Sequence, residues 1–289
     1  MITIRPARKS DKDEVLSFCM NTFSWGDYID RVWDYWYTEE NGRLFIAESG
    51  GEKIAMSHVA ICPEGNSVWL EGIRVRRDHR RSYIATALIS KMLDYGRRRG
   101  AQQASAIVDI TNFASQRMME KNGFKVVSKW LYCSIEDKPR RQKSAARIAN
   151  VNDICDIWQY LQGSKIYHLS AKMYFESWHW YIFDHRTLEN FIKDRRVVVT
   201  GQPIDGIAII NKYGYWDRTS ILQIVYLDSV QAGSVYSLLS FVTNIYLDGK
   251  FDTLHLICYD SKRLTLLFTR KFMVKEQVQF LLYNKQFGS

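Results

Sequence analysis

The chain has 289 residues, of which 46% are apolar and 14% aromatic, and its formal net charge is +9. This composition supports packed cores in one or two domains of ordinary size and argues against an intrinsically disordered protein. No apolar run is long enough to span a bilayer, and the first residues lack the apolar core of a signal peptide, so we expect a cytoplasmic protein without a membrane partner.

The five cysteines are scattered along the chain and form no Cys-x-x-Cys pair, and the six histidines show no metal-ligand spacing. We therefore expect neither a disulfide framework nor a bound metal. His79 lies in an arginine-rich loop, whereas the other histidines are interpreted as structural or solvated.

The first half of the chain alternates between strand and helix patterns. Period-two alternation predicts strands, and apolar residues three or four apart predict helices. Gly50-Gly51 marks a hairpin, and Gly96 and Asn122-Gly123 mark helix ends. The expected elements are strand 2–5, a helix beginning after the N-cap Ser10, helix 30–37, strands 44–48, 53–61 and 67–76, helix 84–96, strand 104–110, helix 114–121 and strand 126–135, which we expect to close the first sheet.

The segment from 67 to 96 predicts an anion site. A strand leads into a loop with four arginines, and the loop leads into a helix whose first amides have no partner inside the helix. Such a helix end favours a phosphate or pyrophosphate, and guanidinium groups add charge and hydrogen-bond donors. The alternative is a solvated basic face. The arginines are Arg76, Arg77, Arg80 and Arg81.

The second half repeats the first in weaker form. Residues 137–146 are polar and basic and predict a linker. After it, Arg147 and Asp153 have the same spacing as Arg5 and Asp11. The expected elements are helix 154–161, strands 191–200, 206–210 and 220–227, helix 234–247, strand 253–258 and helix 263–271. At the position of the arginine loop this half has Asp228 and no arginine, so we expect one anion site per chain.

The ordered segments IRV at 73–75, RRSYIATAL at 80–88, NFAS at 112–115 and EKNGF at 120–124 resemble the acetyl-CoA-binding core of the GNAT N-acetyltransferase superfamily. The resemblance implies an α/β (α+β) fold with a mixed, mostly antiparallel central sheet flanked by helices, here present twice in tandem. The predicted domains are 1–136, a catalytic GNAT domain; 137–146, a basic linker; and 147–289, a degenerate GNAT-like domain. Acetyl-CoA would be the cosubstrate.

The resemblance also implies roles for individual residues. Two parallel strands would separate around the thioester, the loop would hold the pyrophosphate, and the start of the next helix would contact the pantetheine arm. Asn112 has a second interpretation as a helix N-cap. The expected cofactor-binding residues are Ile73, Arg74, Val75, Arg80, Arg81, Ser82, Tyr83, Ile84, Ala85, Thr86, Asn112 and Ser115.

For the general base we select Glu71, an acid on an otherwise apolar strand beside the expected thioester contact; the alternatives are an ion pair with a nearby arginine and a solvated strand end. Asp109 is the weaker candidate. Trp25, Trp33 and Tyr37 lie where the family closes over its acceptor, with core packing as the alternative.

Two residues depart from the family pattern. Tyr83 stands where the family usually has glycine, and Met119 stands where it often has a tyrosine that protonates the leaving thiolate. Methionine has no proton to give. Three functions therefore compete: an N-acetyltransferase for a primary amine on a small molecule or a protein, an acetyl-CoA-binding module with little turnover, and a basic nucleic-acid-binding protein. The nucleic-acid function is not needed to explain the net positive charge, because the basic clusters have local explanations. The acceptor and the oligomeric state stay open.

Overall fold

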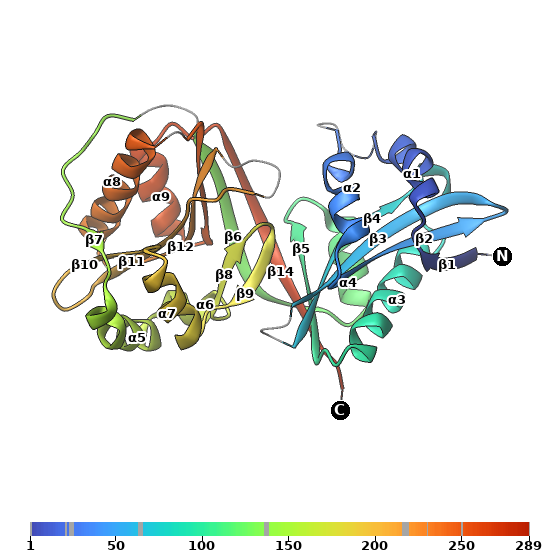
Figure 1. Cartoon of the computed structure of the whole chain (residues 1–289), viewed down its shortest axis with the longest axis horizontal. Helices are drawn as coiled ribbons and strands as arrows, with labels where there is room; N and C mark the ends of the chain where they lie inside the picture. Colours follow the sequence, from blue (N-terminus) through green and yellow to red (C-terminus); the bar gives the residue numbers. More distant parts are fainter. Residues whose placement is uncertain are drawn as a thin grey trace. The chain divides into compact units, whose positions relative to one another are not determined.

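The computed structural model describes residues 2–20, 22, 26–62, 66–135, 139–215, 220–229, 231–249 and 251–288. The chain forms two compact units. The first comprises residues 1–126 and 283–289, and the second comprises residues 127–282. Each unit is an α/β layer structure in which helices cover both faces of a mixed, mostly antiparallel sheet (Figure 1). This confirms the predicted fold class and its repetition.

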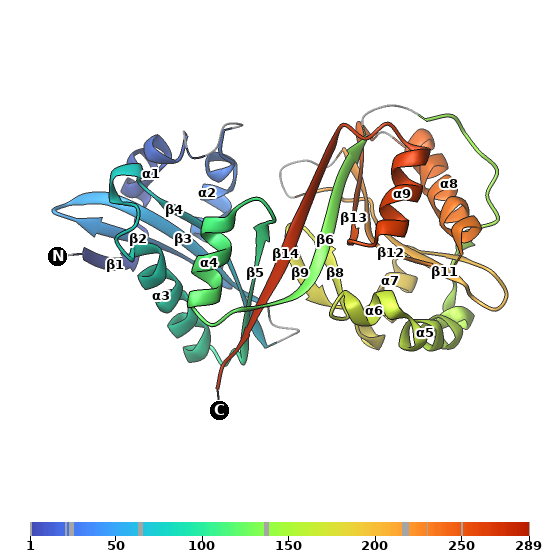
Figure 2. The same cartoon turned by 180° about the vertical axis from the view of Figure 1, so that it is seen from behind.

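In the first unit, α1 and α2 cover one face of the sheet, and α3 and α4 cover the other (Figure 2). The strand order is β1-β2-β3-β4-β5, followed by the end of β14. The elements are β1 (Ile2–Pro6), α1 (Lys12–Cys19), α2 (Ile29–Thr38), β2 (Gly42–Ser49), β3 (Glu52–Cys62), β4 (Ser67–Val75), α3 (Ile84–Arg98), β5 (Gln103–Asp109) and α4 (Phe113–Lys121).

The second unit repeats this plan, with strand order β14-β6-β13-β12-β11-β10-β7 and a separate β8-β9 hairpin. The elements are β6 (Lys125–Ile135), β7 (Arg147–Ile148), α5 (Ile154–Gly163), α6 (Lys165–Leu169), β8 (Met173–Glu176), β9 (His179–Ile182), α7 (His185–Lys193), β10 (Val197–Thr200), β11 (Gly206–Asn211), β12 (Ile221–Ser229), α8 (Ala232–Asp248), β13 (Thr253–Tyr259), α9 (Lys262–Lys271) and β14 (Glu276–Gln286).

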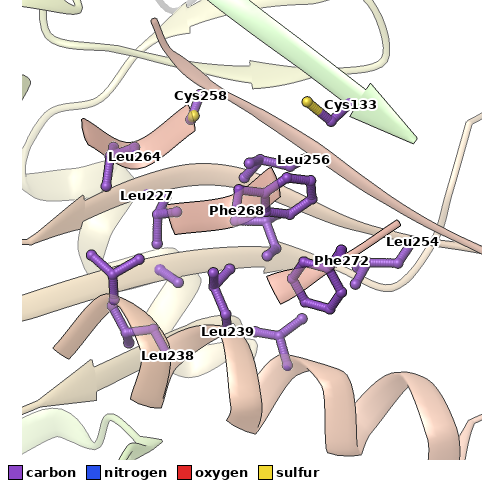
Figure 3. Close-up of a cluster of buried hydrophobic side chains, with 14 of the residues drawn as sticks. Cys133, Leu227, Leu238, Leu239, Leu254, Leu256, Cys258, Leu264, Phe268 and Phe272 are labelled. Carbon is purple, nitrogen blue, oxygen red and sulfur yellow. The ribbon is translucent and has the colours of Figure 1, made fainter. Parts of the chain in front are cut away.

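The core of the second unit lies between its sheet and helices α8 and α9. Leu238 and Leu239 of α8 and Phe268 of α9 pack against strand residues such as Leu256 (Figure 3). All four side chains are fully buried. Burying an apolar side chain of this size stabilises the fold by about 1.5–3 kcal/mol. This half therefore keeps a complete core of its own.

Strand β6 corrects one prediction. It was expected to close the first sheet, but it pairs antiparallel with β13, from Trp130↔Tyr259 to Ile135↔Leu254. The end of β14, residues 283–288, belongs to the first unit instead. The predicted boundaries at 136 and 147 follow the chain in order, whereas the two compact units divide it after residues 126 and 282.

The predicted linker is also part of the second unit. Its described residues, 139–146, run beside α8 and are bound to it by side chains. The Ser144 hydroxyl donates to the Ser237 carbonyl at 2.7 Å, and the Asn244 amide donates to the Gln142 carbonyl at 2.9 Å. Among the described residues, no helix has both the length and the apolar character needed to cross a membrane.

Candidate active site

The parallel strands β4 and β5 separate partway along their length. Their paired register runs from Ser67↔Gln103 to Trp69↔Ser105. Beyond that point β4 continues to Val75 and β5 to Asp109. Residues 73–75 of β4 therefore have no register partner on β5. Contact of their backbone groups with a cofactor stays a prediction.

Glu71 lies at the point where β4 bends. The register between β3 and β4 shifts between Met56 and His58, and Gly72 has φ +62°, a backbone conformation that side chains disfavour. A Cβ on Gly72 would also come within 2.6 Å of the Trp36 ring. The bulge therefore requires glycine here, and it sets the direction of the neighbouring Glu71.

The N-terminus of α3 has free amide donors at the place where the sequence predicts an anion site. The first helical hydrogen bond joins the Ala87 amide to the Tyr83 carbonyl at 3.0 Å, so the amides of Ile84, Ala85 and Thr86 have no acceptor within the helix. The N-cap residue, Tyr83, makes no side-chain capping bond. These donors together suit an anionic oxygen.

The loop before α3 adopts glycine-like backbone angles without glycine. Arg81 has φ +64° and Tyr83 has φ +60°. Tyr83, which stands where the family usually has glycine, thus takes a backbone conformation that glycine adopts without strain. Its side chain is 84% exposed, so it does not pack over the first turn of α3. A left-handed backbone conformation is strained for a residue other than glycine, and such strained residues cluster at functional sites.

The arginines of the loop fall into two groups. Arg76 is neutralised by Asp78 at 2.8 Å and Glu52 at 3.1 Å. The exposed side chain of Arg80 donates to the Val75 carbonyl at 3.1 Å and so links the loop to the end of β4, while Arg81 is exposed. Arg77, Arg80 and Arg81 are thus the exposed arginines of this loop, and their contact with a ligand stays a prediction.

Arg74 has a different role from these arginines. Its side chain is 8% exposed and binds Asp27 through two hydrogen bonds of 2.7 and 2.9 Å. Only its backbone can serve the gap between β4 and β5.

Asn112 is the N-cap of α4. Its side-chain oxygen accepts a hydrogen bond from the Ser115 amide at 3.1 Å, which confirms the capping interpretation. Contact of either residue with a pantetheine arm stays a prediction.

The Glu71 carboxylate belongs to a buried charge cluster. The Nδ1 atom of His58 lies 2.9 Å from Oε1 of Glu71, and its Nε2 atom lies 3.2 Å from Oε2 of Glu39. Burial lowers the pKa of His58, but the two carboxylates outweigh it and the net result is a pKa above its ordinary value. Glu71 thus forms an ion pair, but with a histidine rather than with the arginine that the alternative interpretation expected. Its role as the general base stays a prediction.

The other candidates for proton transfer are less suitable. Asp109 accepts hydrogen bonds from the amide and the hydroxyl of Thr111, both at 2.7 Å, and so stabilises a turn. Met119 is 2% exposed and packs in the interior. At the α4 position where the family often has tyrosine, this chain therefore has a buried methionine, which has no proton to transfer.

The predicted acceptor residues have different environments. Trp33 is 1% exposed and belongs to the core beneath α1 and α2, which favours the core-packing alternative. Tyr37, at the end of α2, is 40% exposed. Trp25 lies outside the described residues. Among the described residues, no group of three or more His, Cys, Asp or Glu side chains is arranged to hold a metal.

Internal carboxylates lie at the equivalent helix start of the second unit. Asp205 accepts a hydrogen bond of 2.8 Å from Ser234 in the first turn of α8. Asp228, 1% exposed, accepts bonds from Ser164, Tyr160 and Tyr226. Burial raises the pKa of Asp228, while these hydroxyls oppose the shift. Two acids at this mouth would repel a pyrophosphate, in agreement with a single anion site per chain.

Sequence reasoning missed His58, Glu39 and Trp36. A weak signal was present, because a histidine stands in the apolar segment 53–61 and becomes the direct cross-strand partner of Glu71. Pairing this histidine with Glu71 required the exact register between β3 and β4, including the bulge. Glu39 follows α2 and reaches His58 only through the tertiary fold.

Comparison with known proteins agrees with this geometry. Residues 13–124 match the family model described as acetyltransferase (GNAT) family. A histidine N-acetyltransferase from Scomber australasicus is 26% identical over 83 residues, which are 29% of this chain and 25% of that protein. The match thus spans about a quarter of the length of this curated relative.

Two solved structures resemble the whole chain. A GCN5-related N-acetyltransferase from Sphaerobacter thermophilus gives a TM-score of 0.64 at 14% identity, covering 99% of this chain and 95% of that one. A tandem GNAT protein from the clavulanic acid biosynthesis pathway gives 0.54 at 9% identity, covering 100% and 99%. At these identities the likeness establishes the fold alone.

Proposed function

We propose that the chain, whose residues 13–124 match the GNAT acetyltransferase family model, transfers the acetyl group of acetyl-CoA directly to a primary amine in a ternary complex. The observation that carries the proposal is the convergence of three features in one unit. These are the separation of β4 and β5 after Trp69, the uncapped start of α3 with Arg80 and Arg81, and Glu71 at the bulge of β4.

In this proposal the cofactor is held by the chain's own donors. The amides of residues 84–86 and the guanidinium groups of Arg80 and Arg81 would bind the pyrophosphate. Backbone groups of residues 73–75 and the start of α4 at Asn112 would hold the pantetheine arm. The cofactor supplies the activated acetyl group when bound.

Glu71 would accept a proton from the amine, directly or through one water, because a protonated amine is not a nucleophile. Met119 offers no proton for the departing thiolate, so that proton would come from water or be taken up in solution. This absence supports the second candidate, an acetyl-CoA-binding module with little turnover.

The test is thiol release from acetyl-CoA by the full chain over a panel of amines. Histidine comes first, because the curated relative is named a histidine N-acetyltransferase. Glu71→Gln should lower kcat by about 10²–10⁴-fold and retain acetyl-CoA binding. Asp109→Asn is the matched carboxylate control and should leave kcat within about twofold, because Asp109 is engaged with Thr111. Cofactor binding without thiol release over the whole panel would favour the binding module instead.

A further inference from the structure

His58 is completely buried between two carboxylates that come from different elements. It lies on β3, directly across from Glu71 on β4, and Glu39 reaches it from the segment after α2. Oε2 of Glu39 and Nε2 of His58 are buried and have no hydrogen-bond partner elsewhere among the described residues. The 3.2 Å contact between them is therefore the interaction that accounts for both atoms.

The geometry of this contact determines the charge of the ring. A neutral imidazole has one N–H donor and one lone pair, so one carboxylate oxygen would face a lone pair across a short distance. An imidazolium offers a donor to each carboxylate. With Glu71 at 2.9 Å from Nδ1 and Glu39 at 3.2 Å from Nε2, the doubly protonated ring satisfies both neighbours.

The packing around the ring favours the same state. The Trp36 indole stacks on the His58 ring with 4.5 Å between centroids and 6° between planes, an arrangement that attracts a cation to the face of the indole. Gly42 leaves room for the contact, since a Cβ there would lie 2.6 Å from Oε2 of Glu39 and 2.7 Å from Nε2 of His58. Glycines at 42 and 72 thus border both sides of the cluster.

The other titratable groups around the ring do not change this balance. Burial raises the pKa of Tyr28 and of Tyr35, and both also feel the Glu71 carboxylate, so they remain neutral phenols. Arg74 and Asp27 neutralise each other at 2.7 Å. On the segment beside Glu39, the Tyr95 hydroxyl donates to the Gly42 carbonyl at 3.3 Å.

We propose that His58 is a positioning residue for the acetyl transfer, a buried imidazolium that fixes Oε1 of Glu71 while Glu39 supplies the balancing charge. The inference rests on the proposed function. It assigns Oε1 of Glu71 to His58, so the ring sets the orientation of the carboxylate toward the amine or its water. A carboxylate fixed in one orientation avoids the loss of rate that a misplaced base causes.

The direct test is an NMR titration of the histidine rings in the full chain, labelled at the imidazole nitrogens. The His58 signal is identified by its absence in His58→Gln. In the unmodified protein both ring nitrogens should be protonated at pH 7. Glu39→Gln should lower the midpoint of the His58 titration by about 1–3 pH units, because it removes one of two adjacent negative charges.

Glu48→Gln is the matched control. It removes a carboxylate from β2 that pairs with Arg5 at 2.7 Å and does not contact His58. The His58 midpoint should be unchanged in this variant. A neutral His58 ring at pH 7 in the unmodified protein, or a midpoint that Glu39→Gln does not move, would overturn the proposal.

Kinetics then test the positioning role. His58→Gln should lower kcat about 10- to 100-fold and leave KM for acetyl-CoA within about twofold, because the cofactor site lies at α3. Glu39→Gln should change the pH dependence of kcat more than its maximum, since a neutral ring can still donate to Glu71. Equal kcat in all variants would refute the role.

The two proposals fail in distinguishable ways. The titration needs no turnover, so a protein that releases no thiol but holds a charged His58 would refute only the proposed function. If His58→Gln does not fold, Glu39→Gln alone carries both measurements.

Discussion

Arg147 binds Asp153 through two hydrogen bonds of 2.7 and 2.6 Å, and Arg5 binds Asp11 in the same way at 2.8 and 2.9 Å. In both units the aspartate also accepts a bond from the backbone amide three residues before it. The pair joins β1 to the start of α1 in the first unit and β7 to the start of α5 in the second. The two halves thus share side-chain detail as well as element order.

The loss of stability on replacing either aspartate should depend on pH. Burial acts to raise the pKa of Asp11, but the hydrogen bonds from Arg5 and the Arg8 amide outweigh it, and the Arg147 guanidinium lowers the pKa of Asp153, so both pKa values lie below the ordinary value of 3.8. Their contribution to stability is therefore present above pH 3.8 and lost as the pH falls through the folded pKa. Asp11→Asn should lower the free energy of unfolding by about 2 kcal/mol at pH 7, and the difference should shrink as the pH falls through the folded pKa.

Asp153→Asn should cost less, about 1 kcal/mol, because the Arg147 side chain is 39% exposed and the Arg5 side chain 14%. Asp34→Asn, at an exposed carboxylate, is the control and should change little. Denaturant unfolding at several pH values measures all three. Equal losses at pH 7 and pH 3 would contradict the ion-pair explanation.

Tyr83→Gly should stabilise the protein. The φ of +60° at Tyr83 is costly for a side chain and free for glycine, so the expected gain is about 1 kcal/mol. Ser82→Gly is the control; with no left-handed strain to relieve, it should be neutral or destabilising. Thermal unfolding compares the two, and a destabilised Tyr83→Gly variant would show that the side chain has an energetic role of its own.

Gly42→Ala should disturb the charge cluster. Its Cβ would overlap Glu39 and His58, so we expect a loss of about 1–3 kcal/mol and a shifted His58 titration. Gly163→Ala, where a Cβ meets nothing within 4 Å, should be neutral or slightly stabilising. If both substitutions leave stability and the His58 signal unchanged, the cluster is looser than the distances indicate.

Asp228→Ala should destabilise the second unit without changing cofactor binding. It leaves three hydroxyls without their acceptor, one of them on the buried Tyr226, at a cost of about 3 kcal/mol. Asp248→Ala, at an exposed ion pair with Arg141, is the control and should cost little. Binding of acetyl-CoA that weakens in Asp228→Ala under native conditions would point to a cofactor role for the second half.

Local patterns predicted most elements, because periodicity and turn residues act within a few positions. The strand predicted at 191–200 is an exception. Phe191 and Ile192 are apolar because they form the buried side of α7, and Arg195, with φ +55°, begins the turn into β10. The predicted strand thus combined apolar residues that belong to two elements, α7 and β10.

Pairing between distant segments could not be read from the sequence. Nothing local in β6 distinguishes β5 from β13 as its neighbour, and β14 was not predicted at all. The candidate site divides in the same way. The loop at Arg80 and Arg81 was visible as a motif, whereas the His58 cluster depends on a bulge and on a residue brought from the end of α2.

The measurement that tests the central claim most directly is calorimetric titration of acetyl-CoA into the full chain, with Arg80→Ala, Arg81→Ala and Arg98→Ala beside it. Arg98, at the far end of α3, matches the change in net charge. We predict one site per chain, weakened about tenfold by each of the first two substitutions and unchanged by Arg98→Ala. Absence of binding, or equal weakening in all three variants, would contradict a cofactor site at the start of α3.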